Sequence, residues 1–169
     1  MRGDLPDDGA PHPEAGLSAL LAAPLDDRTV AYAIAMRRPF EDLRQAAAQL
    51  AGVLVLAAAG SRSAVPDHPM LGLARHACDG ARDAIRSAAV PAQSAHHHRH
   101  LTRAAAWIGR ALEQARSTTR PGGVLDVDGT LPLLRHGWQE LHWATGALPG
   151  FEIIAFDQAC CAHHGRTGG

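Results

Sequence analysis

Cysteine and histidine side chains gather near the carboxyl end of the sequence, within the segment FEIIAFDQACCAHHGR. Thiolate and imidazole together are ligands that zinc, copper(I) and iron–sulfur centres use. Four such side chains lie within five residues: Cys160, Cys161, His163 and His164. Ligands so close together cannot easily surround one ion tetrahedrally. We therefore expect two or three of them to hold zinc or another transition metal, completed by another histidine or by a second subunit. The alternatives are a reactive thiol beside a histidine, or a tail that only packs.

A second group of histidines lies in the segment SAHHHRHL. His96 and His100 are four residues apart, which places both imidazoles on one face of a helix, where they can share a metal ion. His97 lies on the apolar stripe of the same segment and is expected to point into the core. With His142, farther along the chain, His97 or His100 could form a three-histidine metal site between facing helices. The alternative is a solvated helix start in which His97 is an ordinary half-buried side chain.

The segment VLDVDGTL, residues 124–131, resembles the first motif of haloacid dehalogenase-like phosphatases. The resemblance implies Asp126 as the nucleophile that attacks phosphorus and Asp128 as the acid–base, with magnesium between them. That family builds a parallel sheet whose later strands follow this motif. Only 38 residues follow Leu131 here, they read mainly as helix, and the chain has no lysine for the family's later basic position. We therefore interpret the segment as a loop in which Asp128 or Thr130 caps the next helix.

Four consecutive segments carry apolar residues at spacings of three and four, the pattern of amphipathic helices. A helix capped by Asp26 or Asp27 is expected to stop before Pro39, and the first long stripe then runs from Phe40 to Gly60. The second segment follows a capping Asp67 and stops at Pro91, the third spans about 93–118, and the fourth about 131–148.

Two tryptophans of the fourth segment receive different predictions. Trp138 lies on the apolar stripe and is expected in the core. Trp143 lies nearly opposite on the helix and is expected at a dimer or ligand surface.

These segments predict an all-α fold, an antiparallel up-down-up-down four-helix bundle with a short leading helix and an extended C-terminal Cys/His tail. The predicted divisions are a mobile leader at 1–16, the bundle at 17–149, and a tail at 150–169 that associates with the bundle. Alanine is the commonest residue of the stripes, and such seams leave room for a partner subunit. We therefore expect a homodimer.

The composition limits the classes of partner. The chain has 169 residues with 16 basic and 17 acidic side chains, so no basic excess favours nucleic acid or an anionic membrane. The most apolar run, LAGVLVLAAAG, is too short to span a bilayer, and the first residues have no apolar signal core. The three cysteines do not form a disulfide framework, which favours a reducing compartment, the bacterial cytoplasm.

Three functions are compatible with these features. The first is a non-enzymatic binding or accessory protein that holds a metal or a small ligand near the Cys/His tail, with a protein as another possible partner. The second is a bundle metalloenzyme with a histidine-based zinc or iron site that keeps one position open for water. The third is a thiol redox or sensor protein that uses Cys160 and Cys161. The sequence contains no complete catalytic set, which favours the first.

Overall fold

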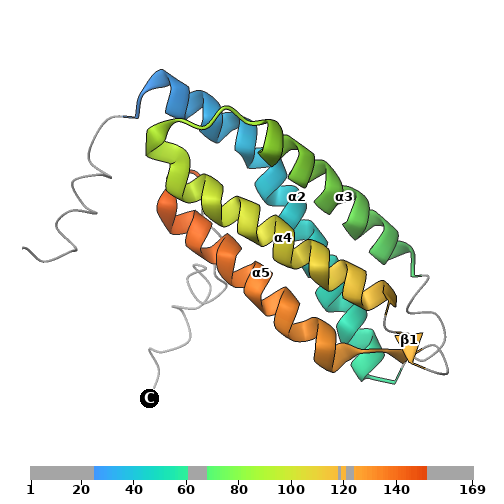
Figure 1. Ribbon diagram of the computed structural model, residues 1–169. Helices are drawn as coiled ribbons and strands as arrows, with labels where there is room; N and C mark the ends of the chain where they lie inside the picture. The colour runs from blue at the N-terminus through green and yellow to red at the C-terminus, as the bar shows by residue number, and fades with distance from the viewer. Residues whose placement is uncertain (1–24, 61–67, 118, 121–123, 152–169) are drawn as a thin grey trace, which may run out of the picture.

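A computed structural model describes residues 25–60, 68–117, 119–120 and 124–151 of the chain. Within these residues the fold is a bundle of α-helices that lie side by side along one long axis (Figure 1). The helices are α2 (Asp27–Ala58), α3 (Pro69–Ser87), α4 (Ala95–Ser117) and α5 (Val127–Ala147), and a single 3-10 turn, η1 (Ala92–Ser94), precedes α4. Each helix packs on its neighbour in the chain, and α2 also contacts α4 and α5. The all-α prediction is confirmed for the described residues.

Helix α2 runs without interruption through Pro39, so the predicted stop before this proline is wrong. A proline inside a helix removes one backbone hydrogen bond and crowds the preceding turn, at a cost of roughly 3 kcal/mol. Burial on both sides of Pro39 offsets this cost. Met36 and Phe40 are 3% and 1% exposed in the same core, and Pro39 itself is buried. Tertiary packing therefore overrides the local signal.

One of the three predicted helix caps is confirmed, and the other two helices are capped by different residues. Asp26 does cap α2, and its Oδ1 accepts a hydrogen bond from the Thr29 backbone N–H at 2.7 Å. His68 caps α3 through its Nδ1, which accepts from the Met70 N–H, whereas Asp67 lies outside the described residues. Helix α5 begins at Val127 and is capped by Asp126 rather than by Asp128 or Thr130.

The segment before α5 contains a short hairpin that was not predicted. Strand β1 (Thr119–Arg120) pairs antiparallel with β2 (Val124–Leu125), and Thr119 faces Leu125 in the register. The Oδ1 atom of Asp126 accepts from the backbone N–H of Gly129 at 3.3 Å, as a helix cap does. The described residues contain no parallel sheet. The similarity to the phosphatases is therefore limited to the sequence of this motif and does not extend to the described fold.

The face that α5 buries includes Leu134 and Leu141 of the predicted stripe but not its tryptophan. Trp138 is 41% exposed, so its predicted place in the core is wrong. Gly137 lies at the contact with α4 instead. A Cβ atom on Gly137 would lie only 2.6 Å from Cγ1 of Ile108 on α4. The missing side chain lets the two helices approach closely. Trp143 is 49% exposed, as expected.

The leading helix expected near 17–23, the mobile leader and the Cys/His tail lie outside the described residues. No helix among the described residues combines the length and the apolar character that crossing a membrane would require.

Candidate functional site

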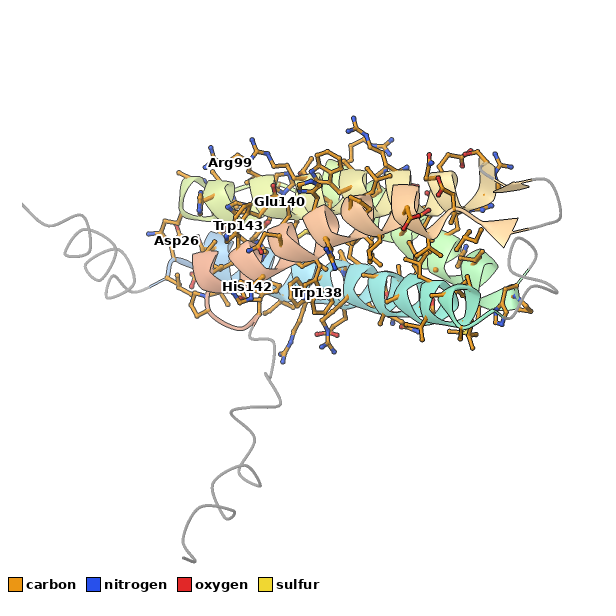
Figure 2. The ribbon with its side chains drawn as sticks, turned by 90° about the horizontal axis from the view of Figure 1, so that it is seen from below. Asp26, Arg99, Trp138, Glu140, His142 and Trp143 are labelled. Atoms are coloured by element: carbon orange, nitrogen blue, oxygen red, sulfur yellow. The ribbon has the colours of Figure 1, made fainter. Side chains whose placement is uncertain are left out.

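Polar side chains gather where the first turns of α4 meet the last turns of α5 and the beginning of α2. Glu140 and Trp143 project from α5 toward the α4 side, where Arg99 lies at the surface (Figure 2). The cluster consists of a hydrogen-bonded chain, Glu140–His100–His96–Arg99, and of a neighbouring buried pair, Tyr32 and His97.

The hydrogen-bonded chain links a buried carboxylate to the surface. Oε2 of Glu140 lies 2.6 Å from Nδ1 of His100, and Nε2 of His100 lies 3.2 Å from Nε2 of His96. Nη2 of Arg99 lies 2.7 Å from Nδ1 of His96. Helical spacing explains the contact between His96 and His100, because residues four apart share a face of the helix.

Chemistry fixes the direction of these hydrogen bonds when both histidines are neutral. Arginine only donates, so Nδ1 of His96 accepts from Arg99, and the His96 proton is on Nε2. That N–H donates to Nε2 of His100. The His100 proton is then on Nδ1 and donates to the Glu140 carboxylate. A carboxylate on Nδ1 therefore orients His100 and leaves its Nε2 lone pair toward the surface.

Burial increases along the chain from the surface inward. His96 is exposed, whereas His100 and Glu140 are 8% and 7% exposed. Burial, together with the charges of His100 and Arg99, lowers the pKa of His96. The second carboxylate oxygen of Glu140 lies 3.8 Å from Nη1 of Arg103, and the Trp143 ring lies 5.7 Å from the His100 ring. Each oxygen of this buried carboxylate therefore has a partner within the protein.

His97 belongs to the core, as expected. It is fully buried, and its Nδ1 lies 3.1 Å from the Tyr32 hydroxyl of α2. Its Nε2 has no hydrogen-bond partner among the described residues. Burial, with smaller effects from the neighbouring histidines, lowers the pKa of His97 to about 4, and burial raises the pKa of Tyr32. His97 is thus a neutral, structural side chain.

Phe151 closes the cluster on its inner side. Its ring centroid lies 4.2 Å from that of His97 and 5.4 Å from that of Phe40, and only 2% of the residue is exposed. The chain therefore leaves the described part of the structure directly beside the histidines of α4.

The predicted three-histidine site with His142 is not formed among the described residues, where no group of three or more His, Cys, Asp and Glu side chains is placed to hold a metal ion. His142 is exposed and projects near Trp138, away from Glu140 (Figure 2). Residues two positions apart on a helix point in directions that differ by about 200°. Glu140 and His142 therefore cannot face the same neighbouring helix. Cys160, Cys161, His163 and His164 lie outside the described residues, and their predicted role stays a prediction.

Sequence reasoning missed Glu140, Arg99 and Tyr32 as members of the cluster. A signal for Glu140 was present. It lies three residues after Gly137 and directly before Leu141, on the edge of the face that α5 buries. A carboxylate at the edge of a buried stripe needs a cationic or hydrogen-bonding partner, which His100 supplies.

Comparisons of the chain with protein-family models, with curated proteins and with solved structures give no match.

Proposed function

We propose that the chain is a non-enzymatic binding protein that holds a transition-metal ion at Nε2 of His96 and Nε2 of His100, with further ligands from the residues after Phe151. The observation that carries the proposal is the 3.2 Å separation of these two nitrogens, together with Glu140 on the other nitrogen of His100. Zinc–imidazole bonds of about 2.0–2.1 Å at a tetrahedral angle place two ligand nitrogens roughly 3.4 Å apart.

Glu140 supports a ligand role for His100. Histidines that bind metals commonly donate their second N–H to a carboxylate, which fixes the ring and increases its basicity. The described structure already provides this arrangement, with the His100 ring held by a short hydrogen bond within the protein. Zinc is one of the ions that imidazole and thiolate ligands suit.

Two histidines do not complete a stable site, so the remaining ligands must come from elsewhere. Phe151 packs against His97, one turn of α4 from His100. Cys160 follows nine residues later in the sequence. Nine residues span at most about 30 Å, so Cys160, Cys161, His163 and His164 are within reach of the α4 histidines. This reach supports the predicted association of the tail with the bundle.

Arg99 opposes metal binding in this site. A metal on Nε2 of His96 requires the His96 proton to be on Nδ1, where the Arg99 guanidinium now donates. Arg99 is exposed and can turn away into solvent, but its positive charge also repels the ion. Removing Arg99 should therefore strengthen metal binding.

We also propose that the helices are connected in an antiparallel up-down-up-down order. We propose further that the chain forms a homodimer and is located in the cytoplasm. Two short links support the first. Only residues 88–94 connect α3 to α4, and residues 118–126 connect α4 to α5.

The test is elemental analysis and zinc titration of untagged protein purified without a metal column. We expect close to one ion per chain in the wild type, bound at least about tenfold more weakly by His100→Gln and His96→Gln. Arg99→Gln should bind more tightly than the wild type, and Cys160→Ser/Cys161→Ser should bind more weakly. Cobalt(II) absorption in the wild type and in the cysteine variant distinguishes thiolate from imidazole ligands.

His76→Gln is the matched control, because it removes an exposed histidine from α3, away from the cluster. Equal zinc affinity in the wild type, His100→Gln and His96→Gln would contradict the proposal. A loss of zinc affinity in His76→Gln as large as the loss in His100→Gln would also contradict it. Circular dichroism of each variant confirms that the bundle remains folded.

A further inference from the structure

A concave site lies between α3 and α4, away from the histidine cluster. It is a cavity of about 480 Å3, and it shares no residue with the cluster. Its lining combines three arginines and two acidic residues with a small apolar floor: Arg75, Cys78, Asp79, Arg82, Ala106, Gly109, Arg110, Leu112 and Glu113. Its volume is in the range of small-molecule sites.

Gly109 makes room for one of the arginines. A Cβ atom on Gly109 would collide with Nη2 of Arg82 and lie 3.3 Å from its Cζ. The guanidinium of α3 thus lies directly on the backbone of α4. No other residue type at position 109 would leave this space.

The other two arginines come from both walls of the cavity. Nε of Arg75 is buried and has no hydrogen-bond partner among the described residues. Arg110, on α4, places its guanidinium 5.0 Å from the centre of the Trp107 ring. Because Nε of Arg75 is buried against the protein, a ligand in the cavity reaches Arg75 only through its terminal nitrogens.

The acidic residues only partly neutralise the arginines. Asp79 lies 3.5 Å from Arg82 and its side chain is 58% exposed, so this ion pair is weak. Glu113 is bound by Arg116 at 2.9 Å, and its side chain is 56% exposed. The lining thus carries three arginines and two acidic residues, an excess of one positive charge, and Glu113 also interacts with Arg75.

We propose that this cavity binds a small molecule through an oxyanion, phosphate or carboxylate, held by Arg75 and Arg82. The planar guanidinium fork fits both anions in a bidentate manner. Ala106, Leu112 and Cys78 provide an apolar floor for a small ring or short chain attached to the anion. Binding of this ligand is independent of metal binding at His96 and His100.

The test is calorimetric titration of the full chain with phenyl phosphate and with benzoate, which separate the two sources of the oxyanion. We expect saturable binding of at least one of them. Arg75→Gln and Arg82→Gln should each weaken it roughly tenfold or more, because each removes a charge-assisted hydrogen bond. Gly109→Ala should also weaken it, because the new methyl group displaces Arg82 without changing the net charge.

Arg86→Gln is the matched control for charge. Arg86 lies on the same helix, paired with Asp83, and does not line the cavity. Its variant should bind both probes within about twofold of the wild type. Absence of saturable binding of both probes would overturn the proposal, and so would equal losses in Arg86→Gln and Arg82→Gln. Thermal unfolding of Gly109→Ala shows whether the variant is folded, since alanine within a helix favours the folded state.

Discussion

His97 shows how a single buried side chain can make stability depend on pH. Burial first, and then the charges of His98, His100 and His96, lower its pKa from 6.5 to about 4. The Tyr32 hydroxyl contacts its Nδ1 and the Phe151 ring packs on its face, so the imidazole is shielded from solvent. The folded chain therefore favours neutral His97.

The sign of the pH effect follows from this pKa. Between pH 6.5 and about 4 the unfolded chain binds a proton at this position and the folded chain does not, so the free energy of unfolding falls as the pH falls. Above pH 6.5, His97 is neutral in both the folded and the unfolded chain, so it no longer makes the free energy of unfolding depend on pH. We expect a loss of about 3 kcal/mol across this interval. His97→Gln, which keeps an acceptor for Tyr32, should show a flatter dependence of stability on pH.

Urea unfolding at several pH values between 4 and 7 measures the effect. His76→Gln, an exposed histidine on α3, should follow the wild-type curve. A His97→Gln curve parallel to that of the wild type would show that other groups cause the acid sensitivity.

At the scale of the element, the close approach of α4 and α5 positions the Glu140–His100 pair. Gly137 lies one turn before Glu140 and faces Ile108, two turns after His100. The helix axes can approach only because residue 137 has no Cβ atom. A wider separation would lengthen the 2.6 Å hydrogen bond between Glu140 and His100.

We therefore expect Gly137→Ala to destabilise the fold by about 1–3 kcal/mol, the usual cost of overpacking a core. Gly146→Ala is the matched control on the same helix, because nothing lies within 4 Å of a Cβ at that position. This control should leave the stability unchanged or raise it by up to about 1 kcal/mol. Chemical unfolding of the two variants measures the difference. Equal stability would show that α4 and α5 separate without cost.

At the scale of the whole molecule, apolar periodicity was sufficient to predict the helical bundle but not the details of its faces. The helix boundaries at Pro39 and at Val127 escaped prediction, because tertiary packing and the Asp126 cap decide them. Trp138 was misplaced because the small Gly137, rather than the large apolar neighbour, faces α4. Contact between distant helices cannot be read from spacing on one helix.

The candidate site was likewise predictable within one helix but not between helices. The pairing of His96 with His100 lies on one helix, and helical spacing predicted it. The partners Glu140 and Tyr32 come from α5 and α2, 40 and 65 residues away from the histidines that they contact. Only the assembled bundle reveals them. The direction of His142 could not be predicted for the same reason, since it depends on how α5 is turned against α4.

The outer face of α2 is where we expect a second copy of the chain to bind. Ile34 is 71% exposed and Val30 is 41% exposed, one turn apart on this helix. Trp138 projects from the neighbouring α5 and is also 41% exposed (Figure 2). A group of exposed apolar side chains on adjacent helices would suit an interface between subunits.

Ile34→Arg should therefore weaken dimerisation by roughly tenfold or more, because a desolvated charge replaces an apolar contact. Leu73→Arg is the control, since Leu73 is 60% exposed on α3, on another face of the bundle. Sedimentation velocity over a range of protein concentrations measures both dissociation constants. A wild type that sediments as a monomer at every concentration would contradict the expected dimer. Dissociation by Leu73→Arg alone would place the interface on α3, and would leave Ile34 as an isolated exposed side chain.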